Sequence, residues 1–222
     1  MSAHESEPVK LREVAYASFT ERLLSRDILP GQFVTQRELV ALTGLPLGAI
    51  RELVPRLEAD GLIKTVPQRG MQVAHIDLGL IRNAFQFRLF LEREAAALYV
   101  LSASDVTLAA LRERHEAVIT KAEARLTEDV IAEAQAVDWS LHDEIIDALD
   151  NEIISSAYRV NSIKIRIIRQ SQTRLYADLV LPVMREHLGI IDAFETRDPQ
   201  AAAKAIGDHI VNAKNRALGF SG

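Results

Sequence analysis

From Asp77 onward, apolar residues recur every three or four positions, which is the period of an α-helix. Ser104 and Asp198 suit the N-cap positions of two such helices, and Pro182 and Pro199 suit first-turn positions. We expect helices over residues 78–101, 105–126, 128–149, 152–176, 182–196 and 199–218. Because the joints between them are short, this part is predicted to fold as an antiparallel all-α bundle of about six helices.

The preceding 76 residues have a different pattern. After a tail over residues 1–8 that we expect to be disordered, the sequence predicts three helices, over 9–25, 36–42 and 47–60. Thr35 and Glu38 have the spacing of a capping box, and Pro55 is expected to kink the third helix or to thin its last turn. Two alternating segments around the turn PQRG predict a two-stranded hairpin. This order is typical of a winged helix-turn-helix domain over 9–76, followed by a helical domain over 77–222.

Composition excludes several kinds of site and location. The chain has no Cys, which rules out disulfides, thiolate metal sites and a Cys nucleophile. It has no uninterrupted apolar run of about 18 residues, and its first residues do not resemble a signal peptide. With 48% hydrophobic and 26% charged residues, we expect a globular protein of the cytoplasm.

The net charge of −5 does not exclude a nucleic acid partner, because charge is informative for each domain separately. Residues 1–76 hold nine basic and nine acidic side chains, whereas the remainder holds 17 basic and 22 acidic ones. The acidity therefore belongs to the helical part. A neutral first part can still bind double-stranded DNA through clustered arginines and backbone N–H groups.

The stretch DWSLHDEII places an acid and an imidazole where a helix is predicted to be buried. Asp138 and His142 lie four residues apart and continue the apolar stripe of that helix. His187 and His209 occupy similar inward positions on two later helices. Four polar groups are therefore expected inside one bundle, where a carboxylate without a partner is costly.

A divalent cation explains these four positions together. An Asp and a His at i and i+4 share one helix face, and neutral imidazoles with one carboxylate suit zinc, nickel, manganese or iron. The alternative is that each is a hydrogen-bonded core residue, which is the usual role of a single inward His. Because four such residues coincide, we favour the metal, most of all zinc, with Asp138, His142, His187 and His209 as ligands.

Two further polar residues, Arg88 and Asn161, also lie on inward faces. Beside a metal, the planar fork of Arg88 suits a carboxylate ligand, because it makes two parallel hydrogen bonds. The alternative is an ion pair with Glu92, one turn along the same helix. Asn161 is the second candidate contact for a small-molecule ligand (effector). For this residue, however, we favour a structural role.

The remaining histidines, His4, His75 and His115, have no comparable setting. His115 stands in the charged run RERHE, and we predict that it is solvated. None of the three is expected to bind the metal.

These residues carry a family likeness. The stretch ILPGQFVTQRELVALTGLPLGAIRELVPRLEADGLIKTVPQRGMQV resembles the winged-helix domain of GntR-type transcriptional regulators. The motifs FQFRLFLEREAA, DWSLHDEIIDALDN and REHLGIIDAFETRDPQAAAKAIGDHI resemble the FCD effector domain of the FadR/VanR branch, and the likeness extends from about Val9 to Leu218. It implies a homodimeric regulator, usually a repressor, whose C-terminal domain binds a metal ion and a small organic acid. The metal ligands of that family correspond to the four residues named above, and its inward arginine corresponds to Arg88.

The resemblance also implies which residues contact DNA. Arg37 and Arg51 correspond to arginines that reach the DNA, and Arg69 and Gly70 lie at the tip of the wing. Where the family commonly has Ser/Thr-Arg-Thr, this chain has Pro46, Leu47 and Gly48, with Gly48 at the surface that faces DNA. We therefore expect an altered operator, or heavier reliance on the remaining arginines and on DNA shape.

Two other functions compete with an effector-responsive regulator. Three histidines and a carboxylate with open metal positions could activate water in a metal-dependent hydrolytic enzyme. Against this, the sequence has no HExxH motif and no recognisable nucleophile motif. The other is a regulator with a purely structural metal, which would not need an inward arginine nearby.

Overall fold

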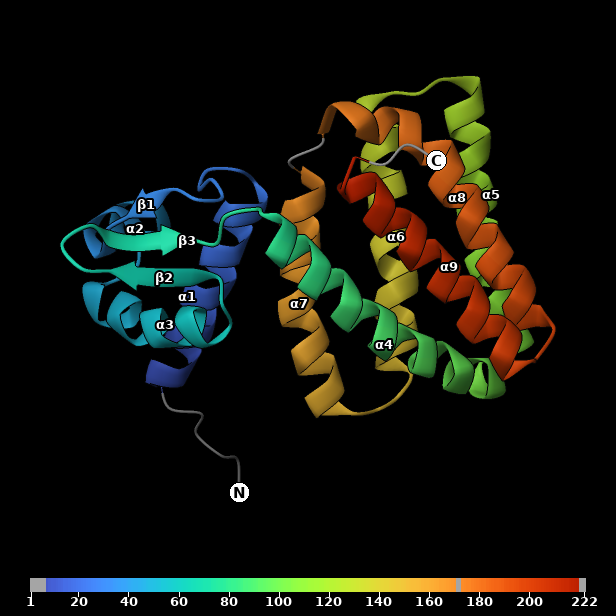
Figure 1. Cartoon of the computed structure of the whole chain (residues 1–222), viewed down its shortest axis with the longest axis horizontal. Coiled ribbons are helices and arrows are strands. Elements are labelled where there is room, and N and C mark those ends of the chain that lie inside the picture. Colours follow the sequence, from blue (N-terminus) through green and yellow to red (C-terminus); the bar gives the residue numbers. More distant parts are fainter. Residues whose placement is uncertain (1–6, 171–172, 220–222) are drawn as a thin grey trace. The chain divides into compact units, whose positions relative to one another are not determined.

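The computed structural model describes residues 7–170 and 173–219. Their contacts divide the chain into two compact units (Figure 1). The first contains the described residues up to Leu80 together with Ile163–Gln170, and the second contains Ile81–Ser162 and the residues from Thr173 onward. Most of the tail expected over residues 1–8 lies outside the described residues, and Glu7 and Pro8 already belong to a helix.

The first unit is built from helices and a small sheet. Its elements are α1 (Glu7–Leu24), β1 (Phe33–Val34), α2 (Gln36–Thr43), α3 (Leu47–Ala59), β2 (Ile63–Val66) and β3 (Gly70–Val73). Phe19, Leu39 and Leu53, one from each helix, are fully buried in a common core. Helix α3 continues through Pro55, which lies at the surface.

The start and end of α2 follow from its sequence. The hydroxyl of Thr35 accepts a hydrogen bond from the Glu38 N–H at 3.2 Å, and the Glu38 carboxylate accepts one from the Thr35 N–H at 2.6 Å. This is the predicted capping box. The helix ends at Gly44, whose φ of 70° is costly for other residues.

The wing has one strand more than the two-stranded hairpin that the sequence predicts. The order is β1-β3-β2, with β1 antiparallel to β3 through the pairs Phe33 with Gln72 and Val34 with Met71. Because β1 has only two residues, it is too short to show an alternating pattern. Only its pairing with β3 identifies β1 as a strand.

We expect Gly70→Ala to destabilise the first unit by about 1–3 kcal/mol. Gly70 has a φ of 90°, and a Cβ added there would lie 2.8 Å from the carbonyl oxygen of Val34. Urea denaturation measures the change. Gly48→Ala is the control, because a Cβ at position 48 meets no described atom within 4 Å, and a helical alanine is at least as stable as glycine. An unchanged Gly70→Ala midpoint would contradict the prediction.

The second unit is an all-α bundle, as predicted. Its helices are α4 (Leu78–Ser102), α5 (Asp105–Ala124), α6 (Glu128–Asp147), α7 (Glu152–Gln170), α8 (Thr173–Glu195) and α9 (Pro199–Ala217). The last turns of α7 and the first residues of α4 are assigned to the first unit. Helix α5 packs against α6 and α8, and α8 packs against α9.

Two predicted helix boundaries are wrong. Pro182 does not begin a helix but lies inside α8, and the helix expected to reach residue 176 ends at Gln170. Pro182 is exposed, whereas its neighbours Val180 and Val183 are buried. The backbone carbonyl that Pro182 leaves without a helical hydrogen bond therefore faces water, and the buried valines hold the helix together on the other side.

Within the part of the chain that the structure describes, no helix combines the length and the apolar character needed to cross a membrane.

Candidate metal centre

The four residues predicted as ligands meet inside the second unit. Helix α6 supplies Asp138 and His142, α8 supplies His187, and α9 supplies His209. Each side chain is at most 3% exposed. One nitrogen or oxygen atom of each lies within 4.8 Å of the corresponding atoms of the other three. The helix periodicity thus correctly predicted that these side chains face the interior of the bundle.

The spacing of these atoms suits a metal ion. The Nε2 atoms of His187 and His209 are 3.3 Å apart, and His187 Nε2 is 3.5 Å from Asp138 Oδ1. Metal–ligand bonds of roughly 2.0–2.2 Å place neighbouring ligand atoms about 3.0–3.5 Å apart. The cluster therefore has the dimensions of a coordination sphere.

The outer nitrogen of each imidazole has its own partner. His142 Nδ1 lies 2.7 Å from Glu92 Oε2, and His209 Nδ1 lies 2.7 Å from Glu186 Oε2. Since a carboxylate only accepts, each Nδ1 carries the proton and each Nε2 presents a lone pair to the centre. His142 Nε2 is buried and has no hydrogen-bond partner among the described residues. A cation at the centre would supply that partner.

Burial keeps the imidazoles of His187 and His209 in the neutral form that binds metal. It lowers the pKa of His187 well below the usual value, and the neighbouring histidines act in the same direction. Burial also lowers the pKa of His209 to about 4, although the hydrogen bond with Glu186 opposes the change. Both rings are therefore neutral near pH 7.

The two outer carboxylates remain ionised. Burial by itself would raise the pKa of Glu92, but the charge of Arg88 and the interaction with His142 outweigh it and lower the pKa. For Glu186, burial is likewise outweighed by hydrogen bonds from His209 and Arg216, which lower its pKa to about 2. Each carboxylate is thus matched by one arginine.

Arg88 fits both interpretations made from the sequence. Its Nε donates to Glu92 Oε1 at 2.5 Å, so the predicted ion pair is present. The side chain is buried, and its Nη1 and Nη2 atoms have no hydrogen-bond partner among the described residues. Glu92 also contacts His142, so only one residue separates the Arg88 guanidinium from the four candidate metal ligands. Its two Nη atoms remain available as donors.

Asn161, the other candidate effector contact, has a structural partner. Its side-chain N–H donates to the carbonyl oxygen of Ala84 at 3.1 Å, and the residue is buried. This bond joins α7 to the backbone of α4.

The prediction that His115 is solvated is wrong. His115 is fully buried, and its Nε2 lies 3.1 Å from His187 Nδ1. A signal was present, since His115 follows Leu111 by four residues and precedes Val118 by three on the buried face of α5. The charged residues beside it in the run RERHE indicated solvent exposure instead. Glu186 was also missed, because it lies beside His187 in the sequence and off the apolar stripe.

A model of the FCD domain matches residues 83–212, more than half of the chain. The chain belongs to the FCD-domain family. It is a GntR-type transcriptional regulator with its FCD domain at the C-terminal end. The match covers all four ligand candidates, as well as Arg88 and His115.

Relatives along most of the chain agree with this family. The chain is 25% identical over 201 residues to the HTH-type transcriptional repressor RspR of Escherichia coli (strain K12), which covers 85% of this chain and 83% of that protein. The structure of E. coli McbR/YncC has a TM-score of 0.77 at 16% identity and covers 94% of this chain and 97% of that one. The metal-free FCD domain of TM0439 has a TM-score of 0.55 at 21% identity, and the match covers 66% of this chain and 97% of that one. The two structures share the fold, and the family and RspR mark the chain as a regulator and not an enzyme.

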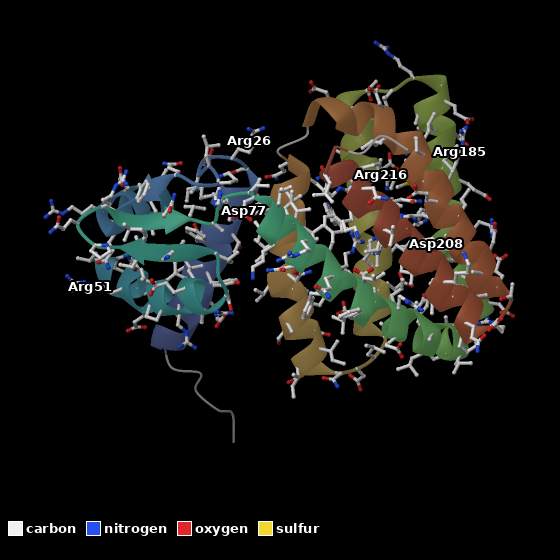
Figure 2. The ribbon with its side chains drawn as sticks, in the orientation of Figure 1. Arg26, Arg51, Asp77, Arg185, Asp208 and Arg216 are labelled. Carbon is white, nitrogen blue, oxygen red and sulfur yellow. The ribbon has the colours of Figure 1, made fainter. Side chains whose placement is uncertain are left out.

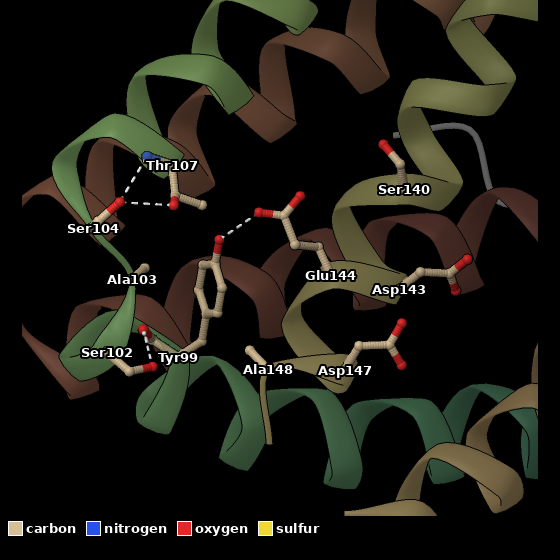
Figure 3. A pocket seen from close by; sticks show the side chains of 10 residues that line it. All are labelled: Tyr99, Ser102, Ala103, Ser104, Thr107, Ser140, Asp143, Glu144, Asp147 and Ala148. Carbon is tan, nitrogen blue, oxygen red and sulfur yellow. Dashed lines mark hydrogen bonds between the residues drawn. The ribbon is translucent and has the colours of Figure 1, made fainter. Parts of the chain in front are cut away.

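The FCD domain contains a hollow between the α4–α5 turn and α6 (Figure 3). Tyr99 donates to Glu144 at 2.9 Å, and Arg114 donates to the other oxygen of Glu144 at 2.9 Å. Asp143 pairs with Arg159 at 2.6 Å. Because these acids are paired with an arginine or a hydroxyl group, we assign no ligand to this hollow.

The residues expected to contact DNA lie at the surface of the first unit. Arg37 on α2 and Arg51 on α3 are exposed and have no ion-pair partner among the described residues. Figure 2 labels Arg51. Arg69 lies over the ring of Phe33, 4.2 Å from its centroid. The position of Gly48 has open space around it, whereas Gly70 is required by the turn of the wing.

Proposed function

We propose that this chain is an effector-responsive repressor of the cytoplasm. A homodimer binds double-stranded operator DNA through the domain formed by residues 9–76. The domain formed by residues 77–222 binds a divalent metal and a small carboxylate that changes the affinity for the operator. The convergence of three Nε2 atoms and one carboxylate, with two unused Arg88 donors close by, carries this proposal.

The metal is held by Asp138, His142, His187 and His209. Zinc suits three imidazoles and one carboxylate best, and nickel, manganese and iron(II) accept the same ligands. When bound, the ion offers coordination positions to the oxygen atoms of a ligand. The solved FCD domain of TM0439 is described as metal-free. This description supports the proposal that a domain of this fold can also bind a metal.

The charges around the centre favour an anionic effector. Glu92 is balanced by Arg88, and Glu186 is balanced by Arg216 at 2.7 Å. Asp138 then leaves one positive charge of a divalent ion without compensation. One carboxylate of an organic acid would balance it in an environment that screens charge poorly.

The geometry of Arg88 supports the same class of ligand. Glu92 uses only its Nε, so Nη1 and Nη2 are available for a second acceptor. A carboxylate accepts two parallel hydrogen bonds from a guanidinium. We therefore place one end of the acid at the metal and the other at Arg88.

The DNA contacts are proposed for Arg37, Gly48, Arg51 and Arg69, with Gly70 shaping the wing. Arg51 is the available cation of α3, since Arg56 binds Glu13 at 2.6 Å. Gly48 leaves space for close approach of α3 to the major groove.

The effector would act by changing the relative orientation of the two DNA-binding domains in the dimer. Half-sites about one helical turn apart require a defined spacing between the recognition helices. The connection AHIDLG, residues 74–79, joins the two domains, and α7 contributes residues to both compact units. A ligand that binds one arrangement more tightly shifts the population toward it.

A gel-shift titration tests the coupling. Operator DNA is first obtained by in vitro selection with the full chain. Affinity is then measured with zinc, after chelation, and with zinc plus acetate, lactate, pyruvate or succinate. We expect at least one acid to change operator affinity only when the metal is present. If neither chelation nor any acid changes it, the coupling is wrong, even if DNA binding persists.

Arg51→Ala is expected to weaken operator binding by roughly 5- to 150-fold, because a base contact by arginine contributes about 1–3 kcal/mol. Arg51 has no ion-pair partner among the described residues, so stability should remain within about 0.5 kcal/mol of wild type. Fluorescence anisotropy with the selected operator measures the change. The control is Arg185→Ala, which removes the same charge from the FCD domain, and equal effects of the two variants would contradict a specific role of Arg51.

A further inference from the structure

His115 is linked to the metal centre through two hydrogen bonds. Its Nδ1 lies 2.7 Å from the carbonyl oxygen of Leu111, and its Nε2 lies 3.1 Å from His187 Nδ1. The residue is fully buried in α5, and neither of its two contacts is a carboxylate that would stabilise a charged ring. His115 is therefore a neutral imidazole with one donor and one acceptor.

The direction of both bonds follows from chemistry. A carbonyl oxygen only accepts, so the proton of His115 lies on Nδ1 and points at Leu111. Its Nε2 is then an acceptor, and His187 Nδ1 must be the donor. This leaves the His187 Nε2 lone pair directed at Asp138 and the other ligand atoms. The backbone of α5 thereby determines the tautomer of a residue on α8.

We propose that His115 is a positioning residue, which holds His187 in the tautomer and ring orientation that bind the metal. The inference rests on the proposed metal site and adds to it a residue outside the ligand set. Outer partners of this kind typically change metal affinity by about 10- to 100-fold when they are removed.

A neutral partner at this position also preserves the charge of the centre. The carboxylate partners of His142 and His209 are each paired with an arginine. Among the described residues, no arginine is paired with His115 or His187. The charge of a carboxylate at position 115 would therefore have to be balanced by the metal ion. The neutral imidazole therefore leaves the positive charge of the metal available to an anionic ligand.

Two variants separate the acceptor from the volume of the ring. His115→Phe removes the acceptor and keeps a buried ring, whereas His115→Gln retains an oxygen acceptor of similar reach. We expect His115→Phe to lower zinc affinity, measured by competition with a chelator, by about 10- to 100-fold and His115→Gln to recover most of it. Leu108→Ala, two turns earlier on the buried face of α5, is the control for general destabilisation and should retain wild-type zinc affinity.

The tautomer itself is measured by nitrogen NMR of the imidazoles in the metal-free wild type. We expect His187 to be protonated on Nδ1, and His115→Phe to shift its proton toward Nε2. Protonation of His187 on Nε2 in the wild type would overturn the proposal, even if the Phe variant does not fold. Wild-type zinc affinity in His115→Phe would also overturn it. If the wild type binds no metal but shows the Nδ1 tautomer, the metal site is wrong and the role of His115 in orienting His187 stands.

Discussion

His187→Ala is expected to lower zinc affinity by more than about 100-fold, because it removes a ligand and not merely an outer partner. His187 Nε2 lies 3.3 Å from His209 Nε2 and 3.5 Å from Asp138 Oδ1. If zinc binds as proposed, a concentration of about 100 times Kd should stabilise the wild type by about 2.7 kcal/mol, or roughly 5–10 °C in Tm. The variant should show little of this stabilisation.

Thermal melts with zinc and with chelator check this prediction in one experiment. Val183→Ala is the matched control, because Val183 is buried one turn earlier in α8 and its truncation creates a cavity without removing a ligand. The control should melt at a lower temperature than wild type but retain the zinc-dependent increase. An equal zinc-dependent increase in His187→Ala would exclude His187 from the site.

Arg88→Lys is expected to weaken the binding of a responsive acid by at least about 30-fold, while zinc affinity stays within a few-fold of wild type. Lysine keeps a positive charge beside Glu92, so no buried carboxylate is left unpaired. It lacks the two Nη donors that have no partner among the described residues. Truncation to alanine would be less informative, because it leaves Glu92 without its counter-charge.

Calorimetric titration of the zinc-loaded protein with the acid identified in the gel-shift experiment measures this loss. Arg82→Lys is the control, since Arg82 is an exposed cation on the same helix. If Arg88→Lys binds the acid as tightly as the wild type, the carboxylate is held elsewhere. Loss of zinc binding in the same variant would instead indicate that Arg88 supports the ligand cluster through Glu92.

Features that depend on residues close together in the sequence could be predicted from the sequence alone. The capping box of Thr35 and Glu38 and the cap at Asp198 both form as predicted. Side chains three or four residues apart share a helix face, so periodicity also predicted correctly that Asp138 and His142 turn inward.

Features that depend on distant parts of the chain were less predictable. Strand β1 exists because β3 pairs with it, and Pro182 remains inside α8 because buried valines flank its exposed position. The charged neighbours of His115 in the sequence predict solvent exposure, which is wrong for this residue. In a helix those neighbours lie on other faces, and the partner of His115 is 72 residues away.

By itself, the sequence determined the order of the helices, the hairpin of the wing and the direction in which the four ligand candidates face, because these depend on spacing along the chain. Only the tertiary structure decided which atoms meet. The positions of Glu92, His115 and Glu186 against the outer nitrogens of three histidines depend on how α4, α5, α6, α8 and α9 pack together. Helix periodicity specifies a face, but a hydrogen bond requires atoms within about 3 Å of each other, and only the packing of whole helices sets that distance.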